Sequence, residues 1–283
     1  MVEIKIVKED QEKIELRRFV YRIKKKRGLD LTLYRPTFLL RRIRARMYNC
    51  GLKEIDTYLT KVEEDLDEWE KLLEALSINV SEFFRDPEVF NYFAKHCLKE
   101  LEERKKANKQ KIIRFWSAGC SFGEEAYSLA IMLRENTDEN YFFTKVFATD
   151  IDANSLAKAK KGLYDESSLK NVSAKLKERY FIRVKEDIWS VNDNLRKMVT
   201  FRQHNLFEKP LFKYFDAIFC RNVRIYFSAQ QSEEVLWNIY NALARGGYLV
   251  LGKVEAMPAS LKKYLVDIEG SCKIFQKRET KGR

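Results

Sequence analysis

Hydrophobic residues in the first quarter of the chain recur at the spacing of an α-helix. From Pro36 to Tyr48 the apolar side chains lie three or four positions apart, and arginines fill the positions between them. Pro36 suits the first turn of a helix, and Gly51 suits the position just after its end. We therefore predict a small all-helical N-terminal domain over residues 1–75.

A second helical pattern occupies the connection to the rest of the chain. It begins at Asp86-Pro87-Glu88, where Asp86 is a candidate N-cap, and it continues to about Arg104. We assign residues 76–110 to a linker segment and helix between two domains.

From residue 111 onwards, short apolar runs alternate with helical patterns. The runs predict strands at Ile112–Trp116, Lys145–Thr149, Val199–Arg202, Phe215–Cys220, Tyr248–Gly252 and Cys272–Gln276. Strands that alternate with helices are typical of a doubly wound, mostly parallel sheet, so we predict an α/β domain over residues 111–283. A period-two alternation interrupts this pattern at about residues 180–198 and predicts a small antiparallel β-hairpin insertion.

The composition fits a folded chain and restricts the chemistry. With 45% hydrophobic and 34% charged residues, the sequence can build a core and a well-solvated surface. No apolar run is long enough to span a membrane and the N-terminus lacks a signal-peptide pattern, so we expect a cytoplasmic protein without membrane insertion. The five cysteines are scattered and there are only two histidines, which argues against disulfides, a metal site or an imidazole-driven reaction.

The net charge of +12 is distributed in blocks. Between Arg17 and Lys53 there are thirteen basic residues against one acid, whereas Glu54 to Glu74 holds nine acids against two lysines. A basic block of this kind fits an acidic partner, and it equally fits a solvated helix face.

The strongest local motif covers residues 115–125 and has the sequence FWSAGCSFGEE. A strand that runs through a glycine turn into a helix lets a ligand approach the backbone, and Asp150 follows at the end of the next strand, where a ribose-binding acid is expected. Acids at the helix start, Glu124 and Glu125, disfavour a pyrophosphate but tolerate a sulfonium nucleoside. The motif favours S-adenosylmethionine over a nicotinamide dinucleotide; the alternative is a tight turn with a helix-capping aspartate.

Polar residues follow two further predicted strands. Arg221 and Asn222 come directly after one strand, with Tyr226 four residues beyond Asn222, and Asn205-Leu206 follows another. Ligands bind at the carboxyl ends of strands in open α/β sheets, although asparagine also forms turns and tyrosine often serves packing.

Taken together, these motifs resemble the CheR-type chemotaxis receptor glutamate O-methyltransferases over nearly the whole chain. The matching stretches, in the family's order, are Ile78–Arg85, Trp116–Tyr127, Ala148–Asp152, Asn205–Phe207 and Cys220–Phe227. The resemblance implies a Rossmann-like class I methyltransferase sheet that methylates chemoreceptor glutamates with S-adenosylmethionine, yields S-adenosylhomocysteine and needs no metal. It also implies that the basic helix around Arg41–Arg46 contacts the helical cytoplasmic domain of the receptor, with no nucleic-acid partner.

The resemblance further implies roles for individual residues. Cofactor contacts would come from Asn79, Ser81, Arg85, Glu125, Asp150, Asn205, Leu206, Arg221 and Asn222. Of these, Glu125 would hold the methionine end, Asp150 the ribose hydroxyls and Asn205 with Leu206 the adenine side. Arg85 and Tyr226 would stand nearest the transferred methyl group, as the catalytic pair.

The sequence departs from the family in several places: Phe122 and Ala126 replace a smaller polar residue and a proline of the glycine-turn motif, and two loops differ. Gly252-Lys253-Val254-Glu255 stands where a Gly-His-Ser-Glu-like run is common. The hairpin region lacks the glycine-rich stretch of members that grip a receptor's C-terminal peptide, so tight tethering to such a tail is not expected. Alternative functions are methylation of a different protein or of RNA, and a non-catalytic scaffold that binds S-adenosylmethionine.

Overall fold

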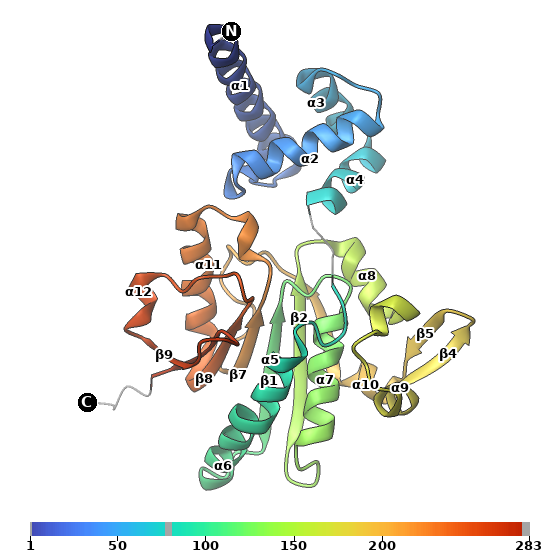
Figure 1. The fold of residues 1–283 in the computed structure, drawn as a ribbon, viewed down its shortest axis with the longest axis vertical. Coiled ribbons are helices and arrows are strands. Elements are labelled where there is room, and N and C mark those ends of the chain that lie inside the picture. Colours follow the sequence, from blue (N-terminus) through green and yellow to red (C-terminus); the bar gives the residue numbers. More distant parts are fainter. Residues whose placement is uncertain (1, 77–80, 279–283) are drawn as a thin grey trace. The chain divides into compact units, whose positions relative to one another are not determined.

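The computed structural model describes residues 2–76 and 81–278, and the chain divides into two compact units (Figure 1). The helical unit comprises Met1–Ile78 together with the short segment Tyr226–Gln231, and the sheet unit comprises Asn79–Ile225 and Ser232–Arg283. In the described part of the chain, no helix has the length and apolar character that crossing a membrane requires.

The helical unit confirms the predicted all-helical N-terminal fold. Its elements are α1 (Val2–Arg27), η1 (Leu31–Leu33), α2 (Pro36–Asn49), α3 (Ile55–Glu64) and α4 (Leu66–Leu76). Pro36 begins α2, and Gly51 follows its end with a φ of 68°, a left-handed conformation that glycine adopts without strain. Phe19, Ile43 and Tyr58 are fully or almost fully buried in the core between these helices.

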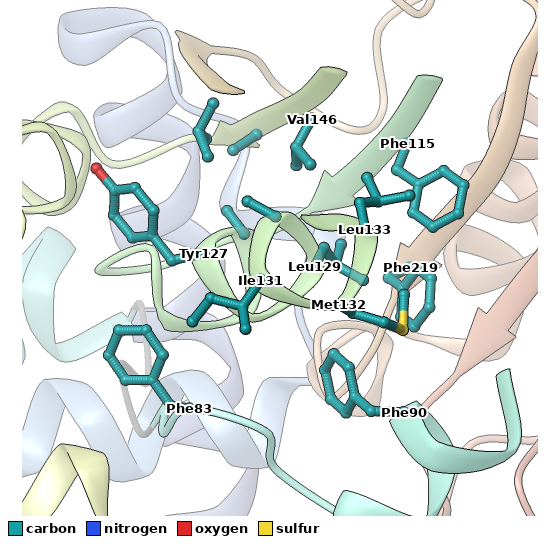
Figure 2. Close-up of a cluster of buried hydrophobic side chains, with 14 of the residues drawn as sticks. Phe83, Phe90, Phe115, Tyr127, Leu129, Ile131, Met132, Leu133, Val146 and Phe219 are labelled. Atoms are coloured by element: carbon teal, nitrogen blue, oxygen red, sulfur yellow. The ribbon is translucent and has the colours of Figure 1, made fainter. Parts of the chain in front are cut away.

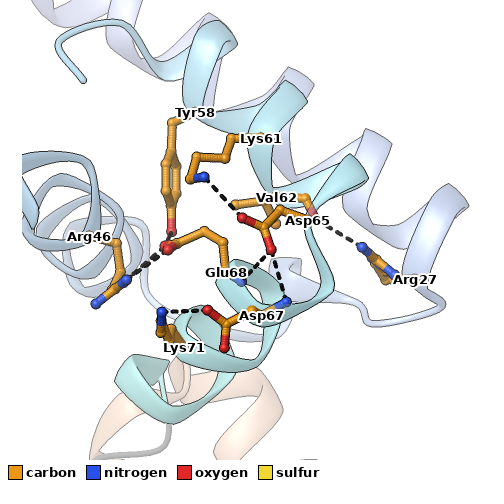
Figure 3. A network of polar contacts seen from close by, with 9 residues as sticks. All are labelled: Arg27, Arg46, Tyr58, Lys61, Val62, Asp65, Asp67, Glu68 and Lys71. Carbon is orange, nitrogen blue, oxygen red and sulfur yellow. Dashed lines mark hydrogen bonds and ion pairs between the residues drawn. The ribbon is translucent and has the colours of Figure 1, made fainter. Parts of the chain in front are cut away.

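The basic and acidic blocks of this unit pair with each other. Arg18 Nη1 lies 2.6 Å from Asp56 Oδ2, and Arg22 pairs with Glu63. Arg46 donates from Nε and Nη2 to the two carboxylate oxygens of Glu68, at 3.0 and 2.7 Å, and Figure 3 shows this pair beside Tyr58. Three of the thirteen basic residues of the block are therefore balanced by the acidic block within the unit.

The sheet unit confirms the predicted doubly wound architecture. Within the described residues its main sheet has the strand order β6-β2-β1-β7-β8-β10-β9. The strands are β1 (Ile112–Ala118), β2 (Phe143–Asp150), β6 (Val199–Gln203), β7 (Phe215–Cys220), β8 (Leu243–Leu251), β9 (Leu265–Glu269) and β10 (Ile274–Lys277). β6, β2, β1, β7 and β8 are parallel, and β10 and β9 add an antiparallel edge. The strand order reverses between β1 and β7, and ligands of open α/β sheets bind at such a switch point.

Helices pack on the sheet and bury its apolar residues. They are α5 (Pro87–Tyr92), the π-helix η2 (Phe93–Leu98), α6 (Lys99–Ala107), α7 (Glu124–Asn136), α8 (Ala153–Lys161), α11 (Ala229–Ala242) and α12 (Ala259–Lys262). The short helix η4 (Arg224–Tyr226) follows β7 in the chain. Figure 2 shows Leu129 and Leu133 of α7 in one buried cluster with Phe90 of α5 and Phe115 of β1. The cluster fixes the start of α7, and therefore the glycine turn before it, against the sheet.

Two predictions about the helix after Asp86 are corrected. The helix continues to Ala107 rather than Arg104, and its middle turns form the π-helix η2. Asp86 occupies the N-cap position but makes no side-chain capping bond, because its backbone is left-handed (φ 57°) and its carboxylate points to Arg221.

The predicted hairpin insertion is present and gains a third strand. β4 (Phe181–Lys185) and β5 (Ile188–Val191) pair antiparallel, and β3 (Leu163–Asp165) joins the other edge of β5. Three short helices, η3 (Glu166–Leu169), α9 (Ala174–Tyr180) and α10 (Asp193–Met198), surround this small sheet.

Candidate active site

The glycine turn between β1 and α7 forms the floor of the candidate site. The N–H groups of Gly119 and Cys120 donate to the carbonyl of Thr149, at 2.8 and 2.9 Å. Gly119 has a φ of 82°, and a Cβ there would lie 2.5 Å from Cγ2 of Val223. Only glycine therefore allows the turn to approach the loop that follows β7.

Asp150 organises this turn from the end of β2. Its carboxylate accepts the N–H of Ser121 at 2.8 Å and that of Asp152 at 3.0 Å. The helix cap of α8 is Asp152, which accepts the N–H of Asn154, so Asp150 itself is not the capping residue. Burial raises the pKa of Asp150 although these backbone bonds oppose the shift.

Glu125 and Arg221 meet beneath the turn. Ser117 donates its hydroxyl to Glu125 Oε1 at 2.7 Å, and Arg221 Nη1 lies 3.5 Å from Glu125 Oε2. The Arg221 side chain is only 2% exposed, and its Nη2 donates to Asp86 Oδ2 at 2.5 Å. Burial raises the pKa of Glu125, and the guanidinium of Arg221 opposes that rise. Two acids, Asp86 and Glu125, thus hold the single buried arginine in a fixed position.

The segment that precedes α5 is held against the same region. Phe83 is fully buried, with its ring 4.9 Å from Tyr164 and 5.1 Å from Phe181 between centroids. The N–H of Phe84 donates to the hydroxyl of Ser128 on α7, at 2.9 Å. Arg85 lies between two residues with left-handed backbones, Phe84 and Asp86, at φ 50° and 57°. Non-glycine residues adopt that conformation only when surrounding contacts enforce it, so the direction of Arg85 is set by the fold.

Residues after β6 lie next to Asp150. The N–H of His204 donates to the carbonyl of Asp150 at 2.9 Å, which places Asn205 and Leu206 beyond the carboxyl end of β6. Asn238 of α11 donates to the carbonyl of Leu206 at 3.1 Å and fixes this loop.

The structure gathers most of the predicted cofactor residues at one edge of the sheet unit. Those it brings together around the carboxyl ends of β1, β2, β6 and β7 are Glu125, Asp150, Asn205, Leu206, Arg221 and Asn222. Ser81 joins them because its side chain hydrogen-bonds to Glu124 at the start of α7, and Arg85 adjoins Asp86, the partner of Arg221. Asn79 lies outside the described residues. Tyr226 belongs to the helical unit, where its ring lies 4.9 Å from that of Phe38.

Several buried polar atoms at the site have no hydrogen-bond partner among the described residues. They are Oε2 of Glu124, Nε of Arg221 and Oδ1 of Asn222. Buried polar atoms are normally satisfied, so those of the adjacent residues Arg221 and Asn222 indicate a polar ligand at the end of β7. Burial also raises the pKa of Glu124 to about 7.

Sequence reasoning missed the parts played by Asp86 and Glu124. Asp86 resembled a helix cap because it precedes Pro87, and no local pattern signals an ion pair across 135 positions. For Glu124 the sequence does hold a signal. Two adjacent acids at the start of a helix point in different directions, so only one of them can meet Arg221 and the other must have a different environment.

The arrangement fits a nucleoside with a charged tail. A carboxylate at the end of β2, a glycine turn open to close approach and a buried arginine flanked by acids offer partners for hydroxyls, an ammonium and a carboxylate. Among the described residues, no group of three or more His, Cys, Asp or Glu side chains could hold a metal ion. Fold and site together define a nucleoside-binding, doubly wound α/β protein with a separate helical unit.

Comparisons with known proteins narrow this class. The CheR methyltransferase SAM-binding domain matches residues 79–273, and the CheR methyltransferase all-alpha domain matches residues 14–77. A chemotaxis protein methyltransferase of Borreliella burgdorferi is 33% identical over 268 residues, covering 89% of this chain and 94% of that protein. That of Salmonella typhimurium is 34% identical over 249 residues, covering 84% and 82%. The chain therefore belongs to the CheR methyltransferase family and carries its S-adenosylmethionine-binding domain.

Proposed function

We propose that this protein transfers the methyl group of S-adenosylmethionine to glutamate side-chain carboxylates of chemoreceptors, forming methyl esters in chemotactic adaptation. The observation that carries the proposal is the pair of partnerless buried polar atoms, Nε of Arg221 and Oδ1 of Asn222, directly after β7 at the switch point of the sheet. The related chemotaxis methyltransferases support the choice of substrate class.

The residues of the site suit the parts of this cofactor. Asp150 would hold the ribose hydroxyls, Glu125 and Arg221 the methionine end, and Asn222 would complete the pocket. Asn205 and Leu206 would flank the adenine. Asn79, Ser81 and Arg85 would close over the cofactor from the segment between the helical and sheet domains, within residues 76–110. When bound, the cofactor supplies an electrophilic methyl group on a sulfonium sulfur.

Such a reaction needs little general acid–base catalysis from the protein. A glutamate carboxylate is ionised at neutral pH and can act as the nucleophile without a general base. Catalysis would then come from alignment and from exclusion of water. We assign Arg85 to orienting the incoming carboxylate through a forked ion pair, and Tyr226 to contact with the carboxylate or the sulfonium. We expect no metal requirement, because neither reactant needs a Lewis acid; undiminished activity with a chelator is the test.

The exposed face of α2 is the proposed contact with the receptor. Arg41, Arg44 and Tyr48 are exposed and lie at spacings of three and four residues, so they share one side of the helix. Arg46 is excluded from this contact because it turns inward to Glu68. An acidic surface on the receptor's cytoplasmic helical domain would complement this face, and we therefore expect the enzyme to act in the cytoplasm. We expect no tail-peptide tether at the β3–β5–β4 insertion.

Calorimetric titration tests the proposal. Native protein is expected to bind S-adenosylmethionine and S-adenosylhomocysteine, and Asp150→Ala is expected to weaken both by roughly tenfold or more, as loss of a buried charged hydrogen-bond partner does. Asp267→Ala, at an exposed aspartate on β9, serves as the control and should bind normally. Labelled-methyl transfer to receptor fragments follows, and Arg85→Ala should reduce the transfer rate strongly even at cofactor concentrations that saturate the variant. Absence of binding by the folded native protein would contradict the proposal.

A further inference from the structure

The loop Gly252–Glu255 contacts two parts of the candidate site, the turn after β7 and the start of α5. Glu255 is 5% exposed, and its carboxylate accepts three backbone N–H groups. Gly252 donates at 2.7 Å, Asn222 at 3.2 Å and Arg224 at 2.9 Å. The carboxylate of Glu255 therefore holds the turn that carries Arg221 and Asn222, with Asn222 in a left-handed conformation at φ 59°.

Gly252 lets the two loops approach closely. A Cβ at this position would lie 2.8 Å from the backbone nitrogen of Asn222 and 2.9 Å from Oε2 of Glu255. The contact between the loop and the Asn222 turn thus depends on a missing side chain as well as on the carboxylate.

Lys253 contacts the start of α5. Its ammonium pairs with Glu88 and lies 3.4 Å from Oδ1 of Asp86, while Oδ2 of Asp86 accepts from Arg221. A row of alternating charges results, from Lys253 through Asp86 and Arg221 to Glu125. Asp86 directly follows Arg85 in the chain, so this row of charges also restrains the backbone next to Arg85.

We propose that Lys253 and Glu255 are positioning residues for the cofactor pocket. Glu255 sets the conformation of the Arg221–Asn222 turn, and Lys253 holds Asp86 where that carboxylate can orient Arg221. This inference rests on the proposed function, since it assigns these residues to the same cofactor site. The lysine that replaces the family's common histidine keeps a permanent positive charge at the end of the row.

The two positions should differ in the size of their effect. Glu255→Gln replaces one acceptor oxygen by an NH₂ group, which would face backbone donors, so we expect roughly a tenfold loss of cofactor affinity. The Lys253 side chain is 44% exposed and its attraction to Asp86 is screened by water, so Lys253→Met should weaken affinity only by about threefold. Because both residues act through the cofactor pocket rather than on the reacting groups, turnover at saturating cofactor should fall by less than the affinity does.

The experiment compares four variants of the whole protein with the native chain. S-adenosylmethionine affinity, its KM and kcat are measured for Glu255→Gln, Lys253→Met and Lys253→Arg. Lys262→Met is the charge-matched control, because Lys262 is exposed on α12. We expect a raised KM with a smaller change in kcat in the first two, recovery in Lys253→Arg, and native behaviour in Lys262→Met.

Hydrogen exchange separates this inference from the proposed function. Without cofactor, both Glu255→Gln and Lys253→Met should speed exchange in Ser81–Asp86 and Arg221–Arg224, with no change in melting temperature for Lys253→Met. Native exchange in these segments together with native KM in Lys253→Met would overturn the inference, and so would equal losses in Lys253→Arg or Lys262→Met. If Glu255→Gln does not fold, the exchange rates and KM of Lys253→Met still test the positioning role. A native protein that binds no S-adenosylmethionine would refute the proposed function, while the exchange data would still test the positioning.

Discussion

Replacing Arg46 by alanine tests whether this arginine of α2 serves the fold rather than the receptor contact. Glu68 is 4% exposed in its side chain, and it accepts two hydrogen bonds from Arg46 and one from the hydroxyl of Tyr58, at 2.8 Å. The substitution would leave a buried carboxylate with the Tyr58 hydroxyl and the Cys50 thiol as its remaining hydrogen-bond partners. Arg44→Ala is the matched control on the same helix, because its ion pair with Glu12 is exposed.

The size of the effect follows from the ways the carboxylate can respond. Breaking a buried ion pair from one side destabilises a protein by about 3–5 kcal/mol. Glu68 can limit this destabilisation by binding a proton. From its ordinary pKa of 4.5, protonation at pH 7 costs about 3.4 kcal/mol. We therefore expect a loss of about 3 kcal/mol for Arg46→Ala and about 0–1 kcal/mol for Arg44→Ala.

The expected pH dependence has a definite sign. Although burial alone would raise it, the hydrogen bonds from Arg46 and Tyr58 leave the pKa of Glu68 below its ordinary value. A lowered acid pKa contributes stability above the unfolded value of 4.5 and loses it as pH falls through the folded value. The difference between native protein and Arg46→Ala should thus shrink to about 1 kcal/mol near pH 5, where protonation is cheap.

Hydrogen exchange read by mass spectrometry measures this in the intact chain. The slowest amides of α2, α3 and α4 report the unfolding free energy of the helical unit alone, which avoids assuming a single transition for two units. Equal protection in Arg46→Ala and Arg44→Ala, or a difference independent of pH, would refute the reasoning.

Three further predictions concern the receptor face, a buried acid and the glycine turn. Arg41→Glu with Arg44→Glu should raise the KM for receptor and reduce its salt dependence while S-adenosylmethionine affinity stays native; kinetics at low and high salt check this. Glu124 has its pKa raised to about 7 by burial, so its contribution to stability falls as pH rises from the ordinary value towards 7, and thermal melts of Glu124→Gln should lack that fall. Gly119→Ala should weaken cofactor binding roughly tenfold or more by pushing the turn off Val223, whereas Gly270→Ala, with no contact nearer than 3.5 Å, should bind normally in the same calorimetric assay.

The sequence predicted the strands that carry several buried residues, the edge strand β6 among them, better than the exposed strands β9 and β3. Strands buried on both faces appear as continuous apolar runs, as at Phe215–Cys220, where every residue is buried. β9 escaped prediction because only Leu265 of its five residues is buried, and β3 because it has three residues. Edge strands need no apolar pattern, since one side faces water.

The site was predictable where chemistry lies in local motifs and unpredictable where it depends on distant partners. Asp150 and Arg221 could be assigned because each follows a strand at the edge where α/β sheets bind ligands. The link from Lys253 through Asp86 to Arg221 joins three separate parts of the chain, and its geometry requires left-handed backbones that no residue type there demands.

The basic and acidic blocks of the helical unit also show that the sequence alone does not identify the partner of a charged residue. Read along the chain, a basic block beside an acidic block suggests either an external acidic partner or a solvated helix face. The structure shows a third outcome, because Arg18, Arg22 and Arg46 of the basic block find Asp56, Glu63 and Glu68 of the acidic block. The positive charge available for recognition on α2 is consequently reduced to its exposed side. A receptor contact built on that side should show a modest salt dependence, set by a few arginines rather than by the whole basic block.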